Sequence, residues 1–99
     1  MLNIKYDKND ANLAIELEGR LDTTTAPELE EKLNSDITGV SKLTFNLKSL
    51  EYISSAGLRV LLSAQKIMNK QGEMIIKDAS EEVQEIFEVT GFSDIFTIQ

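Results

Sequence analysis

The 99-residue chain contains no cysteine and no histidine. Without thiols and imidazoles it has no disulfides, no thiol nucleophile and no His-based acid–base relay, and it lacks the side chains that nearly every zinc site requires. We therefore expect no metal and no other cofactor. A carboxylate pair such as Asp22 and Glu51 would be needed for acid–base catalysis, and nothing in the sequence places these two groups within reach of one another. The sequence predicts a protein that is not an enzyme.

Long apolar runs are also missing. No stretch approaches the length of a membrane-spanning helix, and the amino terminus, Met1 to Lys5, lacks the apolar core of a signal peptide. We expect a cytoplasmic protein that binds no membrane. The formal net charge of −7 argues against nucleic-acid partners, whose phosphates it would repel, and ordinary solubility is the simplest reason for it.

The length and the 41% hydrophobic content suit one small domain, residues 1–99, with a single core. Alternating apolar and polar residues predict three strands, and a short apolar run bounded by Gly72 and Asp78 predicts a fourth. Strands over 2–6 and 13–17, joined by the turn-rich residues 7–10, form an antiparallel hairpin. The third strand covers Leu43–Leu47 and the fourth covers Met74–Ile76.

Capping residues and helical periodicity predict three helices. The first runs from about 26 to 34, the second begins at Ser55, and the third is capped by Ser80 and ends at Gly91. The apolar tail 92–98 folds back onto the core and forms a last short strand. This order of elements predicts an α/β fold with a mixed four- or five-stranded sheet and right-handed parallel crossovers after the hairpin. Because the third strand is polar on one side, we expect the helices to pack mainly on one face.

The stretch Leu47–Leu62 reads as a strand, a polar loop and the start of the second helix, with Ser54 and Ser55 at the junction. Serine is a favoured helix N-cap, and the unpaired amides of a first helical turn also suit an anion. From the residues alone, a cap without further function is the simpler interpretation. A phosphorylation site is the alternative.

The segment Leu50–Leu62 resembles the signature of the STAS domain, specifically of small bacterial anti-sigma factor antagonists, whose pattern is aromatic, apolar, Asp, Ser, a small residue, Gly and Leu. Three further segments fit the same family in order: Gly19–Asp22, Lys70–Glu73 and Thr90–Phe92. Together these segments span almost the whole chain. The resemblance implies a STAS-like fold.

In that family the serine after the Asp is phosphorylated by a partner kinase. Alignment on Gly57 and Leu58 places this serine at Ser55, while Ser54 takes the position of the Asp. The replacement makes the helix start less negative and sets two hydroxyls side by side. The choice of Ser55 over Ser54 therefore depends on the alignment.

The resemblance implies a monomeric regulator of transcription that works by partner switching. Unphosphorylated, it would bind an anti-sigma factor serine kinase; phosphorylated on Ser55, it would be released, and a serine phosphatase would reset it. The alternative is a STAS scaffold or output module of a larger signalling assembly that does not switch. The carboxylate missing at Ser54 favours this alternative. No glycine-rich phosphate loop supports nucleotide binding.

The helical positions after Ser55 predict which side of the second helix meets a partner. At about 100° per residue, Arg59 shares the exposed side with Ser55, and Leu58 and Leu62 lie along its edge as a docking strip. The opposite side is expected in the core and comprises Gly57, Val60, Leu61, Ala64, Ile67 and Met68. Gly57 suits both close packing and access for a kinase.

The loop after the second strand is expected near Ser55, because parallel neighbouring strands end at the same edge of a sheet. Thr25 and Glu28 have the spacing of a capping box, which would explain Thr25. Asp22 has no cap to make in this interpretation, and the resemblance implies that its loop contacts the partner. The predicted partner-binding residues are Asp22, Thr23, Ser54, Leu58, Arg59 and Leu62.

Overall fold

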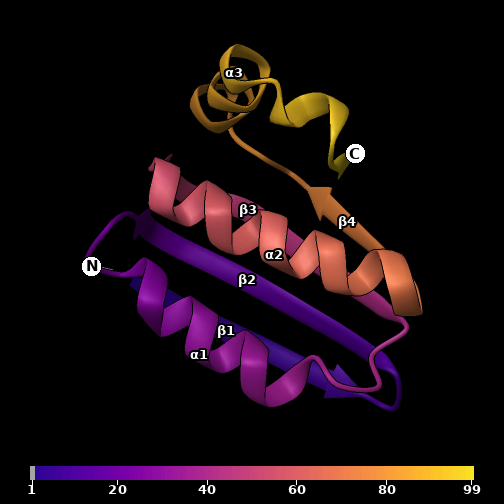
Figure 1. Cartoon of the computed structure of the whole chain (residues 1–99). Coiled ribbons are helices and arrows are strands. Elements are labelled where there is room, and N and C mark those ends of the chain that lie inside the picture. Colours follow the sequence, from indigo (N-terminus) through magenta and orange to yellow (C-terminus); the bar gives the residue numbers. More distant parts are fainter. Residues whose placement is uncertain (1) are drawn as a thin grey trace.

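The computed structural model describes residues 2–99 and shows one mixed sheet with three α-helices (Figure 1). The predicted fold class is confirmed. Strand order is β1-β2-β3-β4-β5; β1 is antiparallel to β2, and every later pair is parallel. The elements are β1 (Leu2–Asn9), β2 (Asn12–Leu21), α1 (Ala26–Asp36), β3 (Lys42–Ile53), α2 (Ser55–Gln71), β4 (Glu73–Lys77), α3 (Glu81–Thr90), a 3₁₀ helix η1 (Phe92–Asp94) and β5 (Thr97–Ile98).

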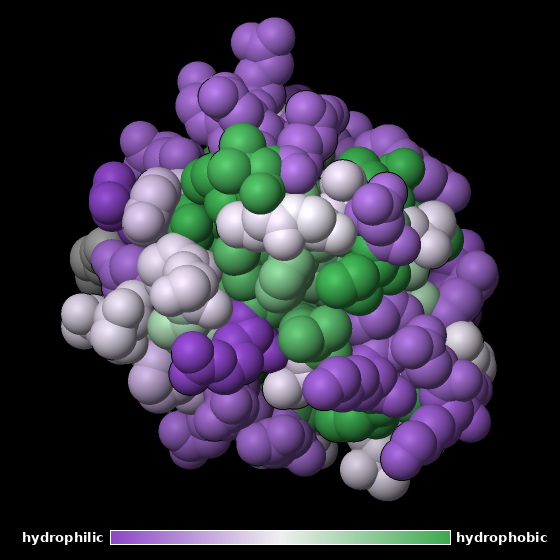
Figure 2. Space-filling model, turned by 45° about the horizontal axis from the view of Figure 1, so that its top comes forward, coloured by the Kyte–Doolittle hydropathy of each residue, from purple (hydrophilic) through white to green (hydrophobic). Residues whose placement is uncertain are grey.

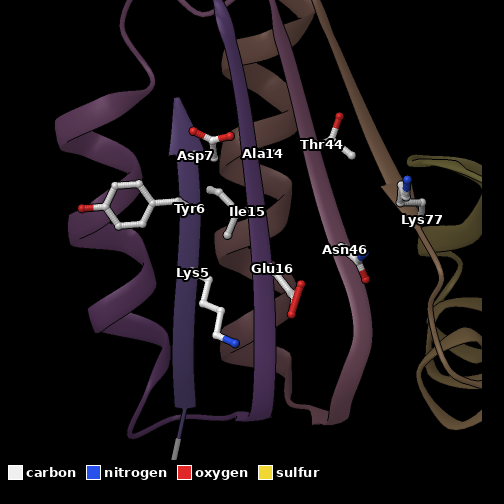
Figure 3. Close-up of a pocket in the computed structure, with 9 residues that line it drawn as sticks. All are labelled: Lys5, Tyr6, Asp7, Ala14, Ile15, Glu16, Thr44, Asn46 and Lys77. Atoms are coloured by element: carbon white, nitrogen blue, oxygen red, sulfur yellow. The ribbon is translucent and has the colours of Figure 1, made fainter. Parts of the chain in front are cut away.

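The helices cover one face of the sheet, as the polar alternation of β3 predicts. In Figure 1, α1 and α2 lie side by side in front of the strands, and α3 lies beyond α2. The apolar side chains that the strands turn toward the helices are buried, and Leu17, Phe45 and Leu47 are fully so. Figure 3 looks onto the uncovered face, where polar side chains such as Glu16 and Asn46 stand in neighbouring strands.

β3 is longer than predicted, and the polar loop expected before α2 is part of this strand. Its pairing with β2 shifts register twice, between Glu16 and Glu18 and between Gly19 and Arg20, and each shift adds one residue on β3. Such bulges let two successive residues point to solvent without turning the following apolar residue outward. Leu50 and Ile53 therefore remain buried although each follows two exposed residues. With these bulges, β3 continues as far as Ile53, the residue before Ser54.

The carboxy-terminal elements agree with their sequence signals. Ser80 caps α3 by accepting a hydrogen bond from the N–H of Val83 at 3.3 Å, and Gly91 follows the helix with φ +82°, which glycine adopts without strain. The ring of Phe96 meets the edges of Phe87 and Phe92, with centroids 5.5 Å apart in each pair. The tail thus folds onto the core as predicted. Within residues 2–99, no helix is both long and apolar enough to span a membrane.

Candidate partner-binding and phosphorylation site

Ser54, one of the two serines predicted to lie at the start of α2, is the N-cap of this helix. Its backbone is extended, with φ −95° and ψ 175°, and its Oγ accepts a hydrogen bond from the N–H of Gly57 at 3.4 Å. The N–H of Ser54 donates to the carbonyl of Leu21 at 2.8 Å, which joins the helix start to the end of β2. The half-buried Ser54 side chain is therefore committed to the local fold.

Ser55 is the first residue of α2, and its side chain is exposed. By helical geometry, the N–H groups of Ser55 and Ala56 have no carbonyl within the helix to bond, so the positive end of the helix dipole stands beside the Ser55 hydroxyl. Arg59 lies one turn further on and is also exposed. The first-turn amides and the Arg59 guanidinium are the groups that could hold a phosphate on Ser55.

A shallow groove of about 160 Å³ lies beside this helix start, between the amino-terminal ends of α1 and α2. Thr23 lies at one side of it and Arg59 at the other, so the structure brings these two predicted site residues together. The complete lining is Thr23, Ala26, Pro27, Glu30, Ala56, Arg59 and Val60.

Gly57 is explained by close packing. A Cβ at this position would lie 2.7 Å from Cγ of Leu21 and 2.9 Å from Cγ1 of Ile53, closer than Cβ atoms approach neighbours in proteins. Both neighbours are buried at the ends of β2 and β3. The missing side chain lets α2 begin directly against the sheet, and this places Ser55 at the sheet edge.

Asp22 organises the loop between β2 and α1. Its Oδ1 accepts hydrogen bonds from the N–H groups of Thr24 at 3.0 Å and Thr25 at 3.1 Å, and the Thr25 hydroxyl lies 3.2 Å away. The hydrogen bond from the N–H of Thr25 is the main reason that the pKa of Asp22 lies below its ordinary value. The N–H of Thr24 and the Thr25 hydroxyl lower the pKa further. The expectation that Asp22 has no cap to make is wrong.

The predicted capping box at Thr25 and Glu28 is also wrong. Thr25 has helical backbone angles, φ −97° and ψ −20°, and its side chain makes no cap hydrogen bond to α1. Instead, its buried hydroxyl donates to the carbonyl of Arg20 at 2.9 Å and accepts from the N–H of Asp22 at 2.9 Å. The spacing suggested a local cap, but in the fold Thr25 closes the loop back onto β2.

The predicted phase of α2 needs a correction. Leu58 is only 4% exposed and belongs to the core, whereas Leu62 is half-buried and Ile67, expected in the core, is 37% exposed. The buried arc is rotated toward Leu58 and the buried Gln65, because burial depends on every neighbour of α2 in the fold, among them α1, β3 and β4, and a helical projection contains none of them. Of the two leucines predicted to form a docking strip, only Leu62 reaches the surface.

An arginine–tyrosine pair that the sequence patterns did not predict lies at the same edge of the sheet. Arg20 and Tyr52 are paired across β2 and β3, and the guanidinium lies 4.6 Å from the centre of the aromatic ring. Tyr52 is 37% exposed and comes two residues before Ser54. Only the strand register, which the bulges in β3 shift, brings Arg20 beside Tyr52.

These features define a small α/β domain that presents a serine at a helix start, flanked by a structured loop and a groove. The sequence matches the STAS domain family over residues 3–99, and the chain belongs to that family. It is 36% identical over 99 residues to the putative anti-sigma factor antagonist BtrV of Bordetella bronchiseptica, covering 98% of this chain and 85% of that protein.

Two further comparisons point to the same group. The chain is 31% identical over 98 residues to the anti-sigma-B factor antagonist of Bacillus subtilis, covering 98% of this chain and 90% of the relative. Its fold is similar to that of the Bacillus cell fate determinant SpoIIAA in the phosphorylated form, with a TM-score of 0.77 and 18% identity, covering 98% of this chain and 91% of that one. The chain is thus similar along nearly its whole length to anti-sigma factor antagonists.

Proposed function

We propose that this protein is an anti-sigma factor antagonist that binds an anti-sigma factor serine kinase in its unphosphorylated state and is released when Ser55 is phosphorylated. The observation that carries the proposal is the exposed hydroxyl of Ser55 at the first position of α2, next to a capping serine that is held by the fold. Similarity to anti-sigma factor antagonists over 98% of the chain supports the partner class.

The proposed interface surrounds Ser55. Arg59 and Thr23 line the groove beside it, Leu62 supplies a half-exposed apolar contact, and Asp22 acts as a positioning residue that shapes the loop carrying Thr23. Leu58 is buried, so it stabilises the position of α2 in the core and does not contact the kinase. Phosphorylation adds about −1.5 to −2 charges at the centre of this surface.

The charge change is large enough for a switch. A thousandfold loss of affinity corresponds to ~4 kcal/mol, which desolvation and like-charge repulsion at a buried interface can supply. Removal of the phosphate by a serine phosphatase would restore the binding surface. The protein would act as a monomer in the cytoplasm, without catalysing a reaction itself.

Phosphorylation assays test the proposal directly. The protein is incubated with ATP and each serine kinase of the source organism in turn, and the modified residue is located by mass spectrometry. We expect one kinase to place a single phosphate on Ser55 and to bind the unmodified protein more tightly than the product. If no kinase modifies the chain, the switching function is wrong.

A second function is favoured by Ser54, which replaces the family's aspartate and leaves the helix start without a carboxylate. The protein would then be a STAS scaffold or output module in a larger signalling assembly. Self-association in solution, measured by light scattering, together with the absence of phosphate transfer, would distinguish this function from the first.

A further inference from the structure

The negative charge of the chain is concentrated at its carboxy-terminal end. Residues 1–77 contain 11 acidic and ten basic side chains and are nearly neutral, whereas residues 78–99 contain six acidic side chains and no lysine or arginine. The net charge of −7 therefore resides almost entirely in the segment that contains α3. Ordinary solubility does not require this asymmetry, and strong charge asymmetry along a chain is typical of a surface that meets an oppositely charged partner.

α3 combines this charge with an apolar surface. Val89 is 80% exposed, the largest exposed fraction among the big hydrophobic residues in the described part of the chain, and Ile86 beside it is half-buried. Positions 82, 85, 86 and 89 share one face of the helix by their spacing. A shallow hollow on this face is lined by Glu82, Glu85, Ile86, Val89 and Thr90.

The carboxylates continue around the helix from this apolar centre. A second hollow shares Val89 and is lined by Glu81, Glu82, Gln84, Glu85, Glu88 and Val89. The last turn of α3 contains no basic residue, so Glu88 stands near the negative end of the helix dipole, where a cation is preferred. In Figure 2, which brings α3 forward, hydrophilic side chains crowd the upper rim and apolar side chains gather below them.

We propose that the outer face of α3 is a docking surface for a basic amphipathic segment of a partner protein. An aliphatic side chain of the partner would cover Val89 and Ile86, and lysine or arginine side chains would pair with Glu82, Glu85 and Glu88. Such a partner would also place positive charge at the carboxy-terminal end of α3, whose last turn contains no basic residue. This surface does not depend on Ser55 or its phosphorylation.

Other occupants fit the surface less well. A second copy of the chain would bring the same carboxylates together, and like charges across an interface are unfavourable. Nucleic acids and anionic lipid surfaces would be repelled. α1 has a similar number of glutamates but contains Lys32 and has no large exposed apolar residue, so it offers the charge without the apolar anchor.

This contrast between helices provides the control for the experiment. The full chain is titrated with a short synthetic amphipathic peptide of leucine and lysine, and amide chemical shifts are followed by NMR. We expect the shifts to map to α3. Glu85→Gln combined with Glu88→Gln should weaken binding by roughly fivefold, since two exposed ion pairs of about 0.5 kcal/mol each contribute about 1 kcal/mol together. Glu28→Gln combined with Glu31→Gln on α1 changes the net charge equally, leaves the groove beside Ser55 untouched and should leave the affinity unchanged.

Two further measurements separate the apolar and the electrostatic contributions. Val89→Ser should weaken peptide binding without affecting folding, because the side chain is exposed, and ~1 M salt should weaken it further by screening the carboxylates. A Ser55→Ala variant should bind the peptide as the wild type does. Shifts spread over α1 and α3 alike, equal loss in both glutamine variants, or a dimer mediated by α3 in light scattering would overturn the proposal.

Discussion

Ser54 and Ser55 are adjacent serines whose positions give them different roles. The hydroxyl of Ser54 accepts from the N–H of Gly57, and its backbone N–H donates to Leu21, so a change at this position disturbs the helix start. The side chain of Ser55 projects from the first turn into solvent. A kinase can reach Ser55 without disrupting a hydrogen bond that the fold requires.

Substitutions at these two serines should therefore have distinct effects. Ser55→Ala should bind the kinase persistently and accept no phosphate, and Ser55→Asp should bind it weakly. Ser54→Ala should lower the free energy of unfolding by about 1 kcal/mol, as the loss of a cap does, and still be phosphorylated. Phosphopeptide mapping and urea unfolding check these outcomes. Phosphate on Ser54 of the wild type would show that the site has moved by one residue.

Asp22 should make stability depend on pH in a predictable direction. Its pKa is lowered in the folded state, mainly by the N–H of Thr25, so the ionised carboxylate stabilises the fold above the unfolded pKa of about 3.9. This contribution is lost as the pH falls through the lower folded pKa. Asp22→Asn should therefore be less stable than the wild type at neutral pH.

The difference between these two proteins should shrink as the pH falls from the unfolded pKa of about 3.9 through the lower folded pKa, because Asp22 is then protonated first in the unfolded and finally in the folded wild type. Urea unfolding at a series of pH values measures this difference directly. A stability gap that stays constant down to the lowest pH would contradict a role for the charge of Asp22.

At the scale of elements, α2 determines how the site is presented. Gly57 lets the helix approach β2 and β3 closely. With its two bulges, β3 extends to Ile53, so the helix cap at Ser54 follows the strand directly. The same helix buries Leu58 and leaves Leu62 half-exposed. These two leucines, one turn apart, therefore test packing and partner binding separately.

Leu58→Ala should lower the free energy of unfolding by ~2–5 kcal/mol, the usual cost of truncating a buried leucine. Leu62→Ala should cost much less and should weaken binding to the kinase instead. Urea unfolding and calorimetric titration of both variants measure the two effects. Equal destabilisation by the two substitutions would contradict the orientation of α2 described above.

At the scale of the whole molecule, phosphorylation should change the surface and leave the fold intact. The hydrogen bonds that fix the helix start involve Ser54, Leu21 and the backbone of Leu58, and none uses the hydroxyl of Ser55. NMR spectra of the protein before and after phosphorylation should differ only around the start of α2, the Thr23 loop and the adjacent end of β3. Shifts that extend across the sheet to β4 and β5 would indicate a conformational switch.

The sequence by itself determined the class of fold and predicted where the candidate site lies. Alternating residues predicted the strands, Ser80 and Gly91 bounded α3 as expected, and Ser54 predicted the start of α2, because these signals depend on neighbours within a few residues. The identity of Ser55 as a candidate phosphorylation site came from the aligned motif rather than from local physics.

Only the tertiary structure decided which side chains from different elements contact one another. The hydroxyl of Thr25 turned back to β2, Asp22 capped its own loop, and the bulges in β3 set Arg20 beside Tyr52. Leu58 was buried by the neighbours that α2 meets in the fold, which a helical projection of one isolated helix does not include. Local patterns specify each element, whereas burial and long-range pairing depend on neighbours that the fold alone assembles.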